Sequence, residues 1–315
     1  MDYKLIDILL ATYNGSRYIE EQIDSILCQT FSDWHLIIHD DGSSDNTLDI
    51  VKRYVAAHPG KIFLVEDGIK TGGAKNNFFH LMKFSTSDYV MFCDQDDVWE
   101  NDKISTAIEN LRTFEGVPAM YCARTNLVDD RLRHIGYGKN PEKKPALEYA
   151  LVHNIATGCT IALNRAGYNL IMRKRPDLNN VLMHDYWVYL VVSAFGVVIF
   201  DKDSKIKYRQ HANNFYGASN GFSLWFSRLK RFIKKNEITL SMQAKEFFDL
   251  YGDEISASNK VLYSRFINAC CSDCIIKRFY YSIGLFYDCG SRIDNFAAFI
   301  SIVTGRHRTN FVNVR

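Results

Sequence analysis

Apolar residues in the first hundred positions alternate between short continuous runs and sets with helical spacing. The runs are rich in Leu, Ile, Val and aromatic residues and predict strands at Leu5–Ala11, Trp34–His39, Lys61–Val65 and Tyr89–Cys93. Between them, apolar residues three or four apart predict helices, which begin after Ser16, after Ser44 or Asp45, near Asn76 and before Ile104. Because strands separated by helices form βαβ units, the pattern predicts an α/β fold with a mostly parallel sheet.

Polar residues follow each of the four predicted strands. They are Thr12-Tyr13-Asn14-Gly15, Asp40-Asp41-Gly42-Ser43, Glu66-Asp67-Gly68 and Asp94-Gln95-Asp96-Asp97. Since the carboxyl ends of parallel strands lie along one edge of a sheet, we expect these residues to meet in one ligand-binding crevice. A cluster of acids there would repel itself unless it held a cation, and oxygen ligands suit Mg²⁺ or Mn²⁺. Helix capping would explain single acids, such as Asp45 and Asp102, but not acids at several strand ends together.

Composition and charge narrow the function classes. The 315 residues are 47% hydrophobic and 23% charged, which excludes a disordered chain, a fibre and a coiled coil. Residues 1–220 hold 24 Lys and Arg against 28 Asp and Glu, whereas residues 221–315 hold 14 against 8. A near-neutral body with a basic tail suits an anionic surface better than a nucleic-acid groove, so no nucleic-acid partner is expected. The P-loop and G-x-G-x-x-G patterns are missing from the sequence, which weakens ATPase, kinase and dinucleotide-binding interpretations.

The remaining sequence signals favour a cytoplasmic protein. The longest nearly apolar stretch, Trp187–Phe200, is too short to span a bilayer, and Met1 leads directly into a strand without a targeting pattern. The eight cysteines are typical of reduced thiols, and the pair Cys271-x-x-Cys274 has no second pair that would complete a zinc site.

The strand-end motifs together resemble those of family 2 glycosyltransferases with the GT-A fold. The segments that carry the resemblance are Ala11–Gly15, Gln29–Phe31, Asp40–Asp45 and Asp94–Trp99, in family-like order and spacing across about residues 4–220. The resemblance implies that residues 1–100 form the nucleotide-sugar-binding half of a GT-A domain. Residues 101–220 would form its acceptor-binding and catalytic half, and residues 221–315 a basic, amphipathic helical extension.

The resemblance also implies roles for individual residues. Tyr13 would stack on the pyrimidine of a nucleotide-sugar, and Asp41 would accept a hydrogen bond from its N3–H. Asp94 and Asp96 would form a D-x-D motif that holds Mn²⁺ or Mg²⁺, with Asp96 as the direct ligand, Asp94 near ribose and metal, and Asp97 behind them. The other residues expected at the nucleotide-sugar are Ala11, Thr12, Asn14, Lys75, Gln95, Thr157 and Gly158. Lys75 could instead simply open a polar helix.

The second half of the domain is expected to supply the base. His184-Asp185-Tyr186-Trp187 opens a predicted helix, where the helix dipole keeps a carboxylate ionised. The family places its catalytic base in such an acidic segment, so the resemblance points to Asp185; the alternative is a helix cap. His184 would be a neighbouring donor or a wedge against the sheet. In Tyr208–Asn214, Arg209 would bind the pyrophosphate and His211 would complete the metal shell, unless that histidine is structural.

Two stretches near the C-terminus combine apolar, aromatic and basic residues. The first, Phe222–Lys235, has its apolar residues on one helical face, and the second is Ile275–Phe286. This pattern is typical of helices that lie in an anionic membrane interface. Packing of these helices on the catalytic domain is the alternative.

We therefore expect a metal-dependent inverting glycosyltransferase on the cytoplasmic face of the inner membrane. It would transfer a sugar from a nucleoside-diphosphate donor to a growing, lipid-linked bacterial surface polysaccharide. Cys93–Trp99 and Tyr208–Asn214 resemble segments of bacterial rhamnosyltransferases, which makes dTDP-L-rhamnose the first candidate donor and a UDP-hexose or UDP-N-acetylhexosamine the second. Alternatives of other classes are a sugar nucleotidyltransferase, disfavoured because Thr12–Tyr18 contains only one basic residue, and a non-catalytic membrane-binding protein.

Overall fold

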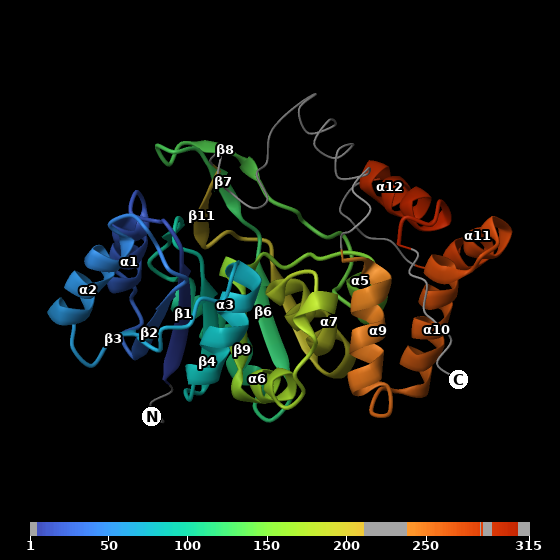
Figure 1. Ribbon diagram of the computed structural model, residues 1–315, viewed down its shortest axis with the longest axis horizontal. Coiled ribbons are helices and arrows are strands. Elements are labelled where there is room, and N and C mark those ends of the chain that lie inside the picture. The colour runs from blue at the N-terminus through green and yellow to red at the C-terminus, as the bar shows by residue number, and fades with distance from the viewer. Residues whose placement is uncertain (1–4, 211–237, 284, 286–291, 308–315) are drawn as a thin grey trace. The chain divides into compact units, whose positions relative to one another are not determined.

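The computed structural model describes residues 5–210, 238–283, 285 and 292–307. The alternating strands and helices form a seven-stranded sheet (Figure 1). The strand order is β10-β6-β9-β4-β1-β2-β3. Neighbours are parallel except β9, which runs antiparallel to β4 and β6, so the predicted mostly parallel α/β sheet is confirmed. The strands are β1 (Ile6–Thr12), β2 (Trp34–Asp40), β3 (Ile62–Leu64), β4 (Tyr89–Cys93), β6 (Ala119–Ala123), β9 (Ala162–Asn164) and β10 (Val197–Asp201).

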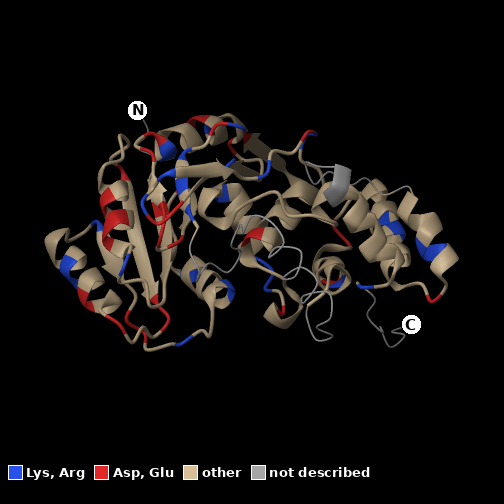
Figure 2. Cartoon of the chain, turned by 90° about the horizontal axis from the view of Figure 1, so that it is seen from above, with Lys and Arg blue, Asp and Glu red and all other residues tan. Residues whose placement is uncertain are grey.

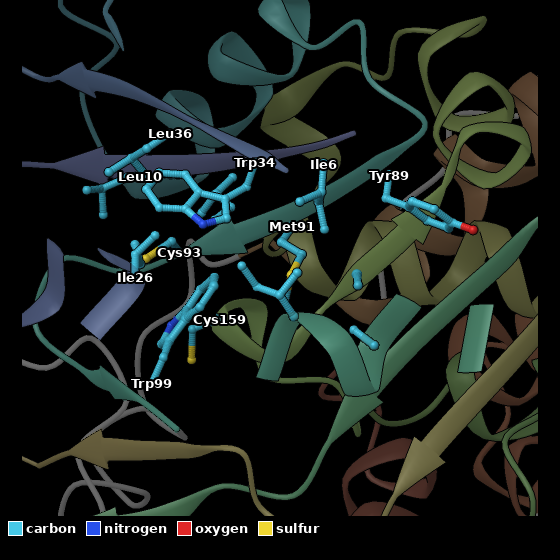
Figure 3. Packing of buried hydrophobic residues seen from close by; sticks show 14 of the residues in the cluster. Ile6, Leu10, Ile26, Trp34, Leu36, Tyr89, Met91, Cys93, Trp99 and Cys159 are labelled. Atoms are coloured by element: carbon cyan, nitrogen blue, oxygen red, sulfur yellow. The ribbon is translucent and has the colours of Figure 1, made fainter. Parts of the chain in front are cut away.

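Helices cover both faces of this sheet. The even-numbered residues of β1 (Ile6, Ile8 and Leu10) share one buried cluster with apolar residues of α1, α2 and α4, and Figure 3 shows part of this packing. On the face turned to the viewer in Figure 1 lie α3, α6 and α7, with α3 packed on β1 and α7 in contact with both other helices. Their bounds are α1 (Ile19–Leu27), α2 (Thr47–Ala57), α3 (Ala74–Leu81), α4 (Lys103–Leu111), α6 (Arg165–Met172) and α7 (His184–Phe195). Short 3₁₀ turns span Met82–Phe84, Arg112–Phe114, Gly158–Thr160 and Leu178–Asn180.

The predicted helix caps are wrong in detail. Helix α1 begins after Tyr18 and α2 after Asn46, rather than after Ser16 and Asp45. The carboxylate of Asp45 instead joins the two helix starts, because it accepts from the backbone N–H groups of Ser16 and Thr47. Asp102 does precede α4, but its carboxylate pairs with Lys205 at 2.6 Å.

A second, four-stranded sheet has the order β5-β11-β7-β8. Its strands are β5 (Val98–Trp99), β7 (Asn126–Val128), β8 (His134–Tyr137) and β11 (Ile206–Arg209). Arg209 is the last residue of β11. Since β11 pairs antiparallel with β5, which directly follows Asp97, the sheet brings Arg209 to the acidic segment.

Contacts divide the chain into two units. The first unit contains residues 1–140, 156–175 and 183–209, and the second contains residues 141–155, 176–182 and 210–315. The second unit's described helices are α5 (Leu147–Ala150), α9 (Leu240–Tyr251), α10 (Ala257–Cys271), α11 (Ile275–Ile283) and α12 (Arg292–Val303). The predicted helix over Phe222–Lys235 lies outside the described residues. Among the described helices, none has both the length and the apolar character needed to cross a bilayer.

The central strands β1 and β4 are joined at their start by a buried carboxylate. Asp7 accepts hydrogen bonds from the hydroxyls of Ser85 (2.8 Å) and Ser87 (2.7 Å) and from the N–H groups of Thr86 (2.9 Å) and Ser87 (3.0 Å). Burial by itself raises the pKa of Asp7, but these hydrogen bonds outweigh it and hold the pKa below its usual value. The turn before β4 is thereby tied to β1.

We predict that Asp7→Ala lowers the free energy of unfolding by about 2–4 kcal/mol, because several buried donors lose their acceptor. Urea denaturation at neutral pH measures the loss. Asp88→Ala removes a neighbouring exposed carboxylate and should change stability by less than about 1 kcal/mol. Equal losses for the two variants would contradict the role given to Asp7.

Candidate active site

The segments expected to form a crevice follow strands at the point where the strand order reverses, because β1 is flanked by β2 on one side and β4 on the other. The segments after these strands share hydrogen bonds. Asn14 has a positive φ of 49°, accepts from the N–H of Ser44 at 2.8 Å and donates its own N–H to Ser43 Oγ at 2.8 Å. The Thr12 hydroxyl donates to Asp40 at 2.9 Å, and Ala11 is half-buried within β1. The motifs after β1 and β2 thus form one connected surface.

Tyr13 presents its ring to solvent from this surface. Its side chain is 57% exposed, whereas its backbone is held on both sides by the Gln95 side chain. The Tyr13 N–H donates to Gln95 Oε1 at 2.8 Å, and Gln95 Nε2 donates to the Tyr13 carbonyl at 3.0 Å. A Cβ on Gly15 would lie 2.2 Å from the same Gln95 oxygen, so this approach requires glycine. Gln95, predicted to touch the donor, uses its amide to position Tyr13.

Asp41 holds the loop that precedes α3. Its carboxylate accepts from the hydroxyl and N–H of Thr71 and from the N–H groups of Gly72 (3.1 Å) and Gly73 (2.7 Å). Burial alone would raise the pKa of Asp41, but these hydrogen bonds lower it, so the group stays ionised. Three of these bonds end on Oδ1 and one on Oδ2, so Oδ2 keeps an acceptor position for the predicted nucleobase contact. Lys75 lies half-buried in the first turn of α3, directly after this loop.

Four carboxylates gather at the end of β4. Burial and the negative charges of Asp96 and Asp185 raise the pKa of Asp94 to about 7. Burial, Asp96 and Asp94 likewise raise the pKa of Asp97, which is fully buried, well above its usual value. The structure therefore brings Asp94, Asp96 and Asp185 together, and Asp97, which was expected behind the first two, lies close to them.

The donor set of this cluster fits a hard divalent cation. One oxygen each of Asp94 and Asp97 and the sulfur of Cys159 lie within 4.8 Å of one another. Within the described part of the chain, the buried Oδ2 of Asp97 has no hydrogen-bond partner. The carboxylates are crowded and their pKa values are raised. A bound Mg²⁺ or Mn²⁺ would offset the repulsion between their oxygens.

Lys103 is a buried cation beside the cluster that the sequence analysis did not identify. Its ammonium donates to the carbonyl of Cys159 and lies 4.1 Å from the ring centre of Trp99. Figure 3 shows Trp99 and Cys159 side by side. Burial lowers the pKa of Lys103, while the neighbouring Cys159, Cys93, Asp97 and Asp94 oppose that effect. The signal in the sequence was a lysine on the apolar face of α4, four residues before Ala107 and five before Ile108.

Asp185 lies in the first turn of α7, which begins after Met183. Its Oδ1 accepts from the N–H of Tyr186 at 2.6 Å. A Cβ on Gly158 would lie 3.6 Å from Asp185 Cβ and 2.8 Å from His184 Nε2, so glycine there admits both side chains. Thr157 precedes it, and its carbonyl accepts from Thr160.

Two roles were predicted for His184, a hydrogen-bond donor beside Asp185 and a packing side chain. The structure shows the packing role. The His184 ring stacks on Phe78 with the ring centres 4.0 Å apart, and burial lowers the pKa of the imidazole to about 3. The neutral ring therefore packs between α3 and α7 and carries no charge toward Asp185.

Arg209 is buried and occupied by protein partners. Its guanidinium donates to the carbonyls of Asp96 (2.9 Å) and Asp130 (2.7 Å) and to the carboxylate of Glu21 (2.5 Å). Its backbone N–H donates to Asp97 Oδ1 at 3.0 Å. This arrangement does not match the predicted pyrophosphate contact and makes Arg209 a positioning residue for the acidic segment. His211, the predicted third metal ligand, lies outside the described residues.

Comparisons with known proteins identify the family. The sequence matches the family model of Glycosyl transferase family 2 over residues 7–171. It is 33% identical over 237 residues to the dTDP-rhamnosyl transferase RfbG of Shigella flexneri, covering 70% of this chain and 78% of that protein.

Solved structures show the same fold. S. aureus TarS 1-349 in complex with UDP-GlcNAc has a TM-score of 0.60 at 15% identity, covering 95% of this chain and 81% of that one. The mannosyltransferase PcManGT from Pyrobaculum calidifontis, in complex with GDP-Man and Mn²⁺, has a TM-score of 0.56 at 16% identity, covering 96% and 74%.

The raised pKa of Asp94 predicts a pH-dependent stability. Its folded-state pKa, about 7, exceeds the ordinary value of 3.8, so the metal-free protein loses stability as pH rises from about 4 to 7. Asp94→Asn cannot ionise and should therefore stabilise chelator-treated protein at pH 8 by on the order of 2 kcal/mol, with little gain near pH 4. Urea denaturation across this range measures the difference. Asp203→Asn, on the surface, is the matched control, and a gain independent of pH would contradict the assignment.

Proposed function

This chain belongs to glycosyl transferase family 2 and is a hexosyltransferase resembling rhamnosyltransferases, and from that premise we propose its donor, metal, base and acceptor. The proposed reaction is metal-dependent, inverting transfer of L-rhamnose from dTDP-L-rhamnose to a growing bacterial surface polysaccharide. The rhamnose donor is supported by the 33% identity to a dTDP-rhamnosyl transferase over most of both chains. Membership of the family sets aside the nucleotidyltransferase and the non-catalytic alternatives.

The observation that carries this proposal is the meeting of Asp94, Asp96 and Asp185, which come from two distant parts of the chain. Residues 1–100 contribute the first two carboxylates and the proposed donor pocket. Residues 101–220 contribute Asp185 and the proposed acceptor side. A donor sugar over the Gly158 turn would then lie between the diphosphate-binding acids and the base.

The donor pocket is proposed to use the exposed Tyr13 ring as a stacking surface for the thymine base. Asp41 would accept from the base N3–H through Oδ2, which accepts one bond from the loop, while Oδ1 keeps the loop at Thr71–Gly73 in place.

We propose that Asp94 and Asp96 hold Mn²⁺ or Mg²⁺, with Asp97 behind them. When bound, the ion would supply positive charge for the diphosphate leaving group. The chain's own contribution is to keep the acids in place: Lys103 offsets part of their charge, and Arg209 fixes the backbone carbonyl of Asp96 and one oxygen of Asp97.

Asp185 is proposed as the general base. Its place in the first turn of α7 keeps the carboxylate ionised through the helix dipole. It would take the proton of an acceptor hydroxyl as that oxygen bonds to the anomeric carbon and the bond to the diphosphate breaks. A single displacement of this kind inverts the anomeric centre.

We predict that Asp185→Asn lowers kcat by about 10²–10⁴-fold, because the amide cannot accept the proton. Release of dTDP from dTDP-L-rhamnose, with a polysaccharide acceptor and Mn²⁺, measures the rate. Thermal stabilisation by dTDP-L-rhamnose should remain in the variant and exceed that by UDP-glucose. Asp203→Asn is the control. A rate of Asp185→Asn within threefold of this control would refute Asp185 as the general base. Stronger stabilisation by UDP-glucose would replace dTDP-L-rhamnose as the proposed donor.

We further propose that the second unit binds an anionic membrane on the cytoplasmic face of the inner membrane, where a lipid-linked acceptor would be reached. Helix α11 turns its apolar residues outward: Ile275, Ile276, Phe279, Tyr280 and Ile283 are exposed. Its buried side carries Arg278, which donates to the carbonyls of Val303 (2.8 Å) and Ser272 (2.7 Å). Figure 2 shows Lys and Arg, in blue, on the helices near the C-terminus, which suits contact with an anionic surface.

We predict that replacing Ile276 and Ile283, which are 74% and 63% exposed, by Asp weakens vesicle binding at least about tenfold. Co-sedimentation with vesicles of phosphatidylethanolamine and phosphatidylglycerol measures the binding. Ser264→Asp on α10 adds one exposed charge off the apolar residues and should bind almost as the wild type does. Equal binding by all three proteins would contradict the membrane surface on α11.

A further inference from the structure

Three side chains with metal-ligating atoms meet near β2, β3 and α3, outside the carboxylate cluster. His39 lies near the end of β2, Asp67 in the loop after β3, and His80 in α3. One ligand atom from each lies within 4.8 Å of the others. Asp67 Oδ2 is 2.7 Å from His80 Nε2, and Asp67 Oδ1 is 3.5 Å from His39 Nε2. The two imidazole rings are 4.7 Å apart at their centres.

The tautomer of His39 is decided by Asn77. The Asn77 amide nitrogen donates to the His39 carbonyl at 3.2 Å, so its oxygen faces His39 Nδ1, at 2.7 Å. Nδ1 must therefore carry the hydrogen. In the neutral ring this leaves the lone pair of Nε2 directed at a carboxylate oxygen of Asp67, an arrangement that is unfavourable unless a cation or a proton lies between them.

The geometry suits a metal ion at that position. Two ligands of a tetrahedral zinc ion, each about 2.0–2.1 Å from it, lie about 3.4 Å apart, close to the separation of His39 Nε2 and Asp67 Oδ1. A ligating histidine usually donates its other ring N–H to an oxygen, as His39 does to Asn77. The N–H of Ile69 donates to Asp67 Oδ1 at 3.0 Å and orients that carboxylate. The Asp67 side chain is 28% exposed, which leaves a route from solvent.

His80 is paired with Asp67 without a metal. Lys83 can only donate, and its ammonium lies 3.3 Å from His80 Nδ1, so Nδ1 accepts and Nε2 carries the hydrogen toward Asp67. Metal binding at Nε2 would move that proton to Nδ1 and displace the exposed Lys83 ammonium. Lys83 is thus a competitor of the ion.

We propose that His39, Asp67 and His80 form a binding site for a transition-metal dication of the Zn²⁺ type, separate from the carboxylate cluster. Two imidazoles favour Zn²⁺ or Co²⁺, whereas the carboxylates after β4 favour Mg²⁺ or Mn²⁺. A bound ion would join β2, the loop after β3 and α3, and so would brace the same loop that Asp41 holds through Thr71 and Gly73.

Titration of the full chain with Co²⁺ and Zn²⁺ tests this proposal, in an Asp94→Asn, Asp96→Asn background that silences the carboxylate cluster. The visible absorption of bound Co²⁺ and calorimetry with Zn²⁺ should report one equivalent. His80→Ala and Asp67→Asn should each weaken binding by at least about tenfold. His58→Ala removes an imidazole elsewhere in the same unit and is the matched control.

A variant that is expected to bind the metal more tightly separates an effect on binding from an effect on folding. Lys83→Gln removes the competing ammonium and should bind Zn²⁺ more tightly than the background protein. Unchanged circular dichroism of the metal-free His80→Ala protein shows that a lost site is not a lost fold. The proposal is overturned if Co²⁺ gives no absorption, or if His80→Ala and His58→Ala bind equally, since the three residues would then be a hydrogen-bonded group only.

Discussion

Negative charge held at the end of β4 is the constraint on which the rest of this structure depends. The raised pKa values of Asp94 and Asp97 show that the carboxylates are brought together against their mutual repulsion and against burial. Lys103 supplies a buried positive charge beside them, and Arg209 fixes the backbone around them. A divalent cation would relieve the remaining repulsion, so the fold holds its acids in an arrangement that favours metal binding.

Several polar side chains of the motifs shape loops rather than face solvent. Gln95 holds the backbone of Tyr13, Asp41 holds the loop before α3, and Arg209 joins Asp96 to Asp130 and Glu21. Burying these hydrogen-bonded groups rigidifies the crevice, because each one satisfies donors or acceptors that would otherwise be stranded. The Tyr13 ring, by contrast, is exposed.

Helix α11 follows a different rule from the helices on the sheet. Its apolar side faces out and Arg278 faces in, because the guanidinium satisfies carbonyls at the ends of neighbouring helices. An outward apolar side is costly in water and becomes favourable against a lipid surface. Elsewhere the second unit buries apolar residues as the first unit does, among them Phe247, Tyr251 and Phe266, so the outward apolar side is a property of α11 and not of the unit as a whole.

The local pattern by itself predicted the four strands of the first hundred residues and the shared edge at which the residues after them lie, whereas Asp185 was expected only from the family resemblance. Periodicity is a property of neighbouring residues, and the carboxyl ends of parallel strands must share an edge. Tertiary structure alone decided the partners of Arg209, Asp41 and Lys103. The reason is physical: Arg209 pairs with a glutamate 188 residues away, and such pairings depend on how sheets and loops pack rather than on any sequence spacing. The same holds for the histidines beside Asp67, which only the packing of α3 on the sheet brings together.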